Sequence, residues 1–359
     1  MARPTRAKPS CTPCGKQYLT VRVLAVLFLS VVMTWLAPVY AASCLSDKLL
    51  GGINLAGAEF NTKKLPGVVG RDYVYPTDKD LAYFRSIGAE SIRLPIRWER
   101  LQPQLLGSLN DRELALIEAV TVTATKLDLC LIIDIHNYGG YAGNAIGSEA
   151  VPTESFLDLW RRIADRFRDN ANVAFGLMNE PSALSIAQWK AIAQRTVDEI
   201  RKSGARNLVL VSGGRWSGAH EWGKQIGETS NADAFSDLRD PVNRTLIEVH
   251  QYADFDYSGT HHDACISPAK IKEIMDGVAR WSKSSGQRLF LGEVGVPPTD
   301  NCLQVLDTML AHVKDNPQVW RGWTYWAAGA WWGKYPLSIQ PRNGEDAPQT
   351  ATLRKYFAK

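Results

Sequence analysis

The stretch Val173-Ala-Phe-Gly-Leu-Met-Asn-Glu-Pro181 is a short apolar run that ends on a glutamate followed by a proline. Later in the chain, Arg288-Leu-Phe-Leu-Gly-Glu-Val-Gly-Val296 contains a second short apolar run that leads to a glutamate, here followed by valine. Short apolar runs that are flanked by turn residues predict buried strands. The two stretches therefore indicate a sheet whose strands carry a carboxylate where they leave the core.

Similar runs recur along the chain and alternate with amphipathic stretches of helical spacing. Strands are expected at residues 51–57, 91–96, 127–137, 173–181, 207–214, 245–252, 288–296 and 322–329. Helices are expected at residues 110–126, 154–168, 184–202, 268–284 and 303–313. Alternation of strand and helix is typical of βα units around a parallel sheet. Eight such units predict an α/β fold, a (β/α)₈ TIM barrel.

The ends of the helices and the extent of the domain follow from local signals. Asn110 and Thr153 are expected to cap helices at their start, and Gly204 and Gly286 to end them. Residues 44–359 contain no linker and no second domain, so one barrel is expected there. A doubly wound sheet is the alternative, but no Gly-rich phosphate fingerprint follows the first expected strand.

Glu180 and Glu293 end two of these apolar runs. Burial of a charge is costly unless the charge is paired or used. Two unrelated ion-paired glutamates would satisfy this rule, but active sites of barrels lie at the carboxyl ends of the strands. The pair therefore predicts an acid/base and a nucleophile, the arrangement that cleaves glycosidic bonds.

Further polar and aromatic residues fall in or at the ends of the other expected strands. A histidine alone is usually a core residue that satisfies a carbonyl group, but polar groups recur at the same end of six strands. The residues that we expect to gather around the two glutamates are Arg93, His136, Asn137, Asn179, His250, Tyr252 and Trp326.

These segments together resemble glycoside hydrolase family 5, the cellulases, and within it the endo-β-1,4-glucanase subfamily. The resemblance covers residues 50–357 and rests on an ordered set of motifs. The motifs are Gly52-Ile-Asn-Leu-Ala-Gly57, Ile92-Arg-Leu-Pro-Ile-Arg-Trp98, Gly176-Leu-Met-Asn-Glu-Pro181, His250-Gln-Tyr-Ala-Asp254, Ser258-Gly-Thr-His261, Leu291-Gly-Glu293 and Trp323-Thr-Tyr-Trp-Ala-Ala-Gly-Ala-Trp-Trp-Gly333.

The resemblance implies a role for each matching residue. Glu180 would be the general acid/base and Glu293 the nucleophile. Arg93 and Tyr252 would keep Glu293 ionised and oriented. Asn179 would bind the 2-hydroxyl group of the reacting sugar.

Other matching residues would contact or support the substrate. His136, Asn137 and His250 would bind sugar or support the carboxylates, and Trp326 would form the floor under the sugar. Because sugar faces stack on aromatic rings, the tryptophans near strand ends are candidates for substrate contact. They are Trp98, Trp216, Trp222, Trp326, Trp331 and Trp332. Trp160, Trp189 and Trp281 lie within expected helices and are expected to pack in the core.

The N-terminal arm is expected to direct export. A basic segment precedes an apolar run at residues 23–36, and Ala41 and Ala42 suit a cleavage site. Residues 1–43 are therefore a signal peptide or, because the apolar stretch is long, a membrane anchor. We expect a secreted or periplasmic protein, with an anchored protein facing outside as the alternative.

Charge argues against a nucleic-acid partner. The chain has 41 basic and 37 acidic residues, but five basic residues precede the first acidic one, which leaves 36 against 37. The positive charge belongs to the arm and not to the domain. A monomer that needs no cofactor and no metal is expected. The loop residues Asp254, Asp256, His261, His262 and Asp263 could suggest a metal site, but a solvated polar loop is preferred.

The cysteines of the exported part have different expected roles. Cys265 and Cys302 lie in loops after successive strands and can form a disulfide in an oxidising compartment. Cys130 lies within an apolar strand and is expected to be a small core residue.

The leading hypothesis is a secreted endo-β-1,4-glucanase that retains anomeric configuration and acts on β-1,4-glucan. A β-mannanase or xyloglucanase, and a membrane-tethered glucanase or transglycosylase in cellulose synthesis, are the alternatives. A non-catalytic carbohydrate-binding protein is disfavoured by the intact pair of glutamates.

Overall fold

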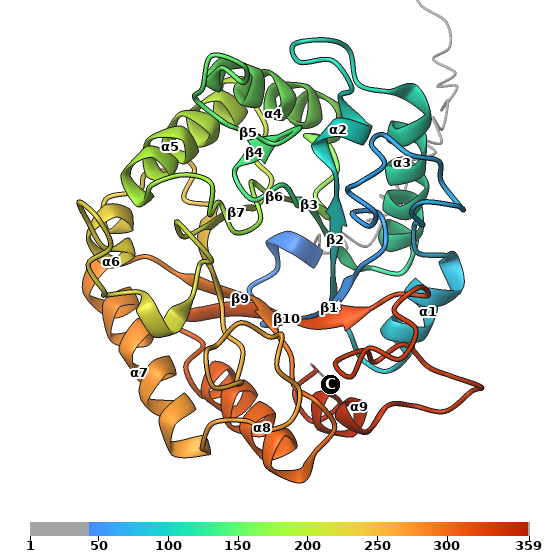
Figure 1. The fold of residues 1–359 in the computed structure, drawn as a ribbon, viewed down its shortest axis with the longest axis vertical. Helices are drawn as coiled ribbons and strands as arrows, with labels where there is room; N and C mark the ends of the chain where they lie inside the picture. Colours follow the sequence, from blue (N-terminus) through green and yellow to red (C-terminus); the bar gives the residue numbers. More distant parts are fainter. Residues whose placement is uncertain (1–42, 358–359) are drawn as a thin grey trace, which may run out of the picture. The chain divides into compact units, whose positions relative to one another are not determined.

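The computed structural model describes residues 43–357, in which eight parallel strands close into a barrel (Figure 1). In chain order they are β1 (Leu50–Leu55), β2 (Ser91–Ile96), β3 (Cys130–Ile135), β6 (Val173–Gly176), β7 (Val209–Ser212), β8 (Thr245–His250), β9 (Leu289–Val294) and β10 (Trp320–Ala328). Around the barrel they follow the order β1-β10-β9-β8-β7-β6-β3-β2. The predicted (β/α)₈ fold is confirmed.

Helices form a ring around the strands (Figure 1). The long ones are α1 (Asp78–Ser86), α3 (Asp111–Lys126), α4 (Thr153–Phe167), α5 (Ile186–Lys202), α7 (Pro268–Ser285) and α8 (Asp300–Asp315). Shorter helical turns are η1 (Ser43–Leu45), α2 (Trp98–Leu101), η2 (Ala219–Glu221), α6 (Asn231–Phe235) and α9 (Pro348–Leu353). The strands β4 (Gly140–Tyr141) and β5 (Asn144–Ala145) pair as a small antiparallel ribbon after β3.

Helix α5 illustrates how local sequence sets these elements. The Ser185 side chain accepts from the backbone N–H of Gln188, and the Gln188 side chain accepts from the N–H of Ser185, which closes a capping box. Buried residues recur three and four positions apart along the helix and face the barrel. They are Ile186, Trp189, Ile192, Ala193, Thr196, Val197 and Ile200.

The predicted helix ends are mostly in place. Asn110 caps α3 with its side chain, and Gly286 ends α7 with φ of 75°, in the left-handed region that favours glycine. Gly204, with φ of 85°, follows the end of α5. The prediction for Thr153 was wrong, because Pro152 is the N-cap and Thr153 is the first helical residue.

The amino-terminal end of the barrel is filled with apolar side chains. These are Leu50, Cys130, Ile132, Ala174, Leu208, Leu210, Leu246 and Phe290, with Cys44 of η1 packed among them. Cys44 and Cys130 form a disulfide. This bond was not predicted, because Cys130 was expected only to be a small core residue. Cys130 is buried as expected, but its sulfur faces the segment that precedes β1.

The predicted disulfide between Cys265 and Cys302 is confirmed and joins the connection after β8 to the first turn of α8. The N-terminal arm, where a signal peptide or anchor is expected, lies outside the described residues. Within residues 43–357, none of the helices is long and apolar enough to span a membrane.

Candidate active site

The two glutamates meet at the carboxyl end of the barrel. Glu180 follows β6 by four residues and is partly exposed, whereas Glu293 lies within β9 and is buried. A carboxylate oxygen of each lies within 4.8 Å of the other and of a ring nitrogen of His250. Glu180 has φ of 40°, a strained backbone conformation for a residue with a side chain, and such strain is found most often at functional sites.

Both oxygens of Glu293 are held by neighbouring side chains. Arg93 donates from Nη1 to Oε1 at 3.1 Å, and the Tyr252 hydroxyl donates to Oε2 at 2.6 Å. Arg93 comes from β2 and Tyr252 follows β8, so contacts across the barrel fix the carboxylate from two sides. The predicted neighbourhood of these three residues is present in the structure.

The charge state of Glu293 reflects opposing effects. Burial raises its pKa above the usual value and Glu180 adds to this, whereas His250 and Arg93 oppose it. Burial also opposes the charge of Arg93, but Asp134, Glu248 and Glu293 outweigh burial and raise its pKa. Arg93 therefore remains a cation that favours the ionised nucleophile.

His250 lies between two carboxylates. Its Nδ1 is 2.8 Å from Oε1 of Glu180, and its Nε2 is 3.1 Å from Oε1 of Glu248. Burial alone would lower the pKa of His250, but Glu293, Glu180 and Glu248 together raise it to about 10. His250, which was expected to bind sugar or support the carboxylates, contacts the candidate acid/base directly.

His136 has the opposite electrostatic environment. Its Nδ1 lies 2.8 Å from Oδ2 of Asp134, and burial holds its pKa well below the usual value. Its ring stacks on Trp326, with centroids 5.5 Å apart and planes at 16°. A neutral imidazole that donates from Nδ1 leaves Nε2 as an acceptor, and the Tyr138 hydroxyl lies 3.3 Å from it.

Asp134 and Glu248 are the site residues that sequence reasoning missed. Each precedes a site histidine by two positions, so both members of a pair point to the same face of their strand. Gly292 makes room for Glu248, because a Cβ there would lie 2.1 Å from Oε1. A charged residue inside an otherwise apolar strand, two before a histidine, was the available signal.

The two asparagines differ in their contacts. Asn179 accepts from Nη2 of Arg93 at 2.8 Å, and its Nδ2 has no hydrogen-bond acceptor within residues 43–357. Asn137 uses both of its amide hydrogens, toward Glu99 and the carbonyl of Gly140. Asn137 therefore supports the loop after β3, while Asn179 keeps a donor beside Glu180.

The tryptophans near strand ends separate into two groups. Trp326 lies 9% exposed in the site, and Trp332 packs edge-on against it with centroids 5.9 Å apart. Trp216 is about half exposed and lines the cleft. Trp331 is also exposed, on the loop after β10.

The expectation was wrong for Trp98 and Trp222, which are fully or almost fully buried. Trp98 packs against Tyr141 and Phe156, and Trp222 against Phe235 and other rings. Trp160 and Trp189 are core residues as predicted. Trp281 is only partly buried and donates from Nε1 to the carbonyl of Ala232.

A cleft of about 660 Å³ opens beside Glu180. Its walls come from the ends of β3, β6 and β8 and from the loops after β7 and β8. The lining residues are Tyr138, Glu180, Trp216, Gly218, His220, Glu221, His250, Tyr252, Asp256, Tyr257, Ser258 and Thr260.

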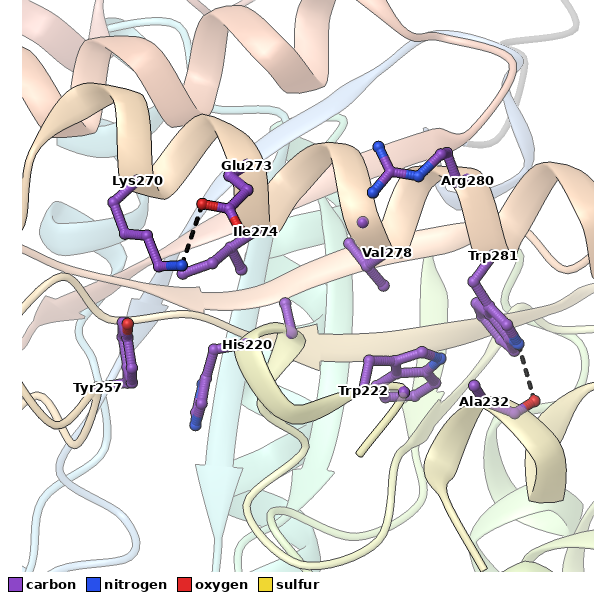
Figure 2. Close-up of a pocket in the computed structure, with 13 residues that line it drawn as sticks. His220, Trp222, Ala232, Tyr257, Lys270, Glu273, Ile274, Val278, Arg280 and Trp281 are labelled. Carbon is purple, nitrogen blue, oxygen red and sulfur yellow. Dashed lines mark hydrogen bonds and ion pairs between the residues drawn. The ribbon is translucent and has the colours of Figure 1, made fainter. Parts of the chain in front are cut away.

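A second cavity of about 350 Å³ lies between η2 and α7 (Figure 2). It shares His220 and Tyr257 with the cleft, and these rings stack with centroids 4.3 Å apart. Its carboxylate, Glu273, forms an ion pair with Lys270 at 3.0 Å, drawn as a dashed line in Figure 2. A single exposed ion pair offers no acid/base partner, so we assign the chemistry to the cleft.

The loop after β8, predicted to be a solvated polar loop, is held by hydrogen bonds to a buried carboxylate. Asp254 is buried and accepts hydrogen bonds from the backbone N–H groups of Gly259, Thr260 and His261. It holds the loop that forms one wall of the cleft.

At the glutamates, a divalent metal would face the cations Arg93 and His250. The two glutamates are therefore better suited to acid/base chemistry than to metal binding.

Comparisons with known proteins agree with this geometry. The model of the cellulase family, glycosyl hydrolase family 5, matches residues 53–329. Endo-β-1,4-glucanase B of Emericella nidulans is 33% identical over 82% of this chain and 86% of its own.

Solved structures are similar as well. XacCel5A, determined in complex with cellopentaose, is 44% identical with a TM-score of 0.84, over 87% of this chain and all of the other. Endoglucanase Cel5A of Pseudomonas stutzeri, determined with cellobiose, is 35% identical with a TM-score of 0.79, over 86% of this chain and 92% of the other. The chain thus belongs to glycosyl hydrolase family 5, the cellulase family, and is a glycoside hydrolase.

Proposed function

We propose that this protein is an exported endo-β-1,4-glucanase that hydrolyses its substrate with retention of configuration. The observation that carries the proposal is the spacing of the glutamates, since one carboxylate oxygen of Glu180 lies within 4.8 Å of one of Glu293. Retaining glycosidases hold their carboxyl groups about 5–5.5 Å apart, whereas inverting enzymes leave about 6.5–9.5 Å for a water molecule.

In the first step Glu293 attacks the anomeric carbon while Glu180 gives its proton to the glycosidic oxygen. The bond between the anomeric carbon and that oxygen breaks as the bond to Glu293 forms. Arg93 and Tyr252 hold the attacking carboxylate in place. A fixed, oriented nucleophile lowers the barrier because little reorganisation remains for the reaction step.

In the second step Glu180 acts as a base. It takes a proton from water, whose oxygen attacks the anomeric carbon and displaces Glu293. The charge of Glu293 is absent from the covalent intermediate, which favours the ionised form of Glu180 at this stage. Two inversions at one carbon return the β-configuration.

The sugar at the cleavage point would rest on Trp326, whose ring stacks on that of His136. Asn179 has an amide donor without an acceptor beside Glu180, which supports its proposed contact with the 2-hydroxyl group. The preference for β-1,4-glucan is supported by the relatives that bind cellopentaose and cellobiose.

Export is supported by the basic and apolar N-terminal segment and by two disulfides within the barrel. N-terminal sequencing of the mature protein tests this part of the proposal. A mature chain that begins after Ala41 or Ala42 is the expected result, and an intact arm in a membrane fraction would contradict cleavage.

Activity is tested with carboxymethylcellulose, galactomannan and xyloglucan as substrates. We expect a rapid fall in the viscosity of carboxymethylcellulose and little product from the other two. Proton NMR of the first products should show the β-anomer before mutarotation. Initial formation of the α-anomer would contradict the retaining course, and preferred cleavage of galactomannan would contradict the glucanase assignment.

A further inference from the structure

The ring of His250 has a carboxylate on each nitrogen. Glu248 and His250 lie two residues apart on β8 and both point into the barrel, so Glu248 sits one layer below the ring. Nε2 of His250 is 3.1 Å from Oε1 of Glu248, and Nδ1 is 2.8 Å from Oε1 of Glu180. His250 and Glu248 are each 2% exposed, so bulk water does not supply hydrogen-bond partners to these two side chains.

Counting protons restricts the possible states of this chain of groups. An ionised carboxylate only accepts hydrogen bonds, and a neutral imidazole has a single N–H. Two hydrogen bonds from His250 to two carboxylates therefore need either a doubly protonated ring or a proton on one of the carboxyl groups.

Glu248 is the carboxylate that stays ionised. Its Oε1 also lies 3.0 Å from Nε of Arg93, an ion pair in which both side chains are almost fully buried. Burial opposes ionisation of Glu248, but Arg93 and His250 outweigh it and hold the pKa below the usual value. Gly292 leaves the space that this carboxylate occupies.

The remaining choice lies at Glu180. If its proton bonded to Nδ1 of His250, it would point toward the ring and away from a glycosidic oxygen in the cleft. If His250 carries both protons, Oε1 of Glu180 accepts from the ring and Oε2 is free to hold the catalytic proton. Only the second arrangement leaves the acid ready for its proposed role.

We propose that Glu248 is a positioning residue that holds His250 as a doubly protonated cation, which in turn orients Glu180 and sets the pH range of catalysis. The inference rests on the proposed function of Glu180 and deepens it. The cation of His250 also lies 3.7 Å from Oε2 of Glu293, so one charge acts on both carboxylates.

The other charged groups around His250 come from strands that are not adjacent to β8 in the barrel. His136 after β3 disfavours a cation at His250, while Asp134 on β3 favours it. Arg93 on β2 is a cation that contacts Glu248, and like charges disfavour each other. Burial raises the pKa of Asp134, and Arg93 opposes this effect. Glu248 is the carboxylate in direct contact with the far side of the ring, which makes it the residue to change.

Two measurements test the proposal on the full-length mature enzyme. The first is ¹⁵N NMR of the histidine rings in the wild type, where His250 is expected to be doubly protonated at pH 7. The second is the pH profile of kcat/KM for Glu248→Gln. His250 lowers the pKa of Glu293, so loss of the cation favours the protonated form of Glu293 and the acidic limb should move to higher pH by about one unit or more.

Two further variants separate charge from packing. Glu248→Asp keeps the charge and should restore the wild-type acidic limb at least in part. Glu113→Gln is the matched control, because Glu113 is also a buried carboxylate but binds Tyr73 and Tyr75 away from the cleft. Its pH limbs should not move.

The outcomes are distinct. A neutral His250 in the wild type at pH 7 overturns the proposal even if Glu248→Gln fails to fold. So does a Glu248→Gln enzyme whose ring stays doubly protonated or whose acidic limb does not move. The ring is observed without substrate, so failure of the proposed glucanase activity would appear separately, as a wild type that does not cleave carboxymethylcellulose.

Discussion

Tyr252→Phe removes a single hydroxyl group from the candidate nucleophile. In the wild type that hydroxyl donates to Oε2 of Glu293 at 2.6 Å, and the next donor to this oxygen is Nδ1 of His250 at 3.7 Å. Hydrogen bonds to charged groups contribute about 1.5–3 kcal/mol. Since one pKa unit corresponds to about 1.4 kcal/mol, the pKa of Glu293 should rise by about 1–2 units.

The sign of the effect follows from the ionised nucleophile. Burial already raises the pKa of Glu293, and loss of a donor to its ionised form raises it further. Activity falls as the pH drops through this pKa, so the acidic limb of kcat/KM should move to higher pH by about 1–2 units. The alkaline limb should be less affected. Both limbs are measured by initial rates on a soluble chromogenic cello-oligosaccharide between about pH 3 and 9. This range spans the usual pKa values of carboxyl and histidine groups.

Tyr325→Phe is the matched control. Tyr325 is also a buried tyrosine on the barrel, but its hydroxyl donates to the backbone carbonyl of Val296 at 3.0 Å. This variant should lose stability without a shift of the acidic limb. An acidic limb in Tyr252→Phe that stays within error of the control would refute the idea that Tyr252 stabilises the ionised nucleophile.

Three further predictions concern the carboxylates and the stability of the barrel. Glu293→Gln should abolish turnover, whereas Glu180→Ala should keep activity on aryl glycosides with good leaving groups, because such groups need no proton; equal loss on aryl and natural substrates would contradict the assignment. Replacing Cys44 and Cys130 by serine should lower the free energy of unfolding by up to about 4–5 kcal/mol for a separation of 86 residues, measured by urea denaturation; an unchanged midpoint would show that the bond contributes nothing. The pKa of Asp240 is about 2, because a buried arginine of α5 and backbone N–H groups outweigh burial, which alone would raise it. The ionised Asp240 therefore contributes stability that is complete above about pH 4 and is lost as the pH falls toward 2. Asp240→Asn should flatten this part of the stability–pH curve.

The strand pattern could be predicted from sequence because alternation of apolar runs and helical stretches is a local signal. The expected strand at residues 91–96 coincides with β2. The expected strand at 173–181 ends at Gly176, and Asn179 instead donates its backbone N–H to the carbonyl of Ile135. The chain leaves the sheet there to bring Glu180 into the cleft, which hydrophobicity alone does not reveal.

The rest depends on which way side chains point. In the sequence Cys130 resembles any apolar strand residue. Its disulfide partner Cys44 is 86 residues away, so no local pattern indicates the bond. Trp98 and Glu180 both follow strands closely, yet the indole of Trp98 turns into the core. The position of Glu248 two residues before His250 was a signal in the sequence, but its ion pair with Arg93 of another strand could not be predicted from it.

The disulfide between Cys44 and Cys130 also has a consequence for attaching the enzyme to a solid support. It ties the start of the described chain into the apolar layer at the amino-terminal end of the barrel, and the cleft opens at the carboxyl end. An enzyme immobilised on a bead through this end would present its cleft to the surrounding solution. Long polymer chains could then reach the glutamates without first passing the support.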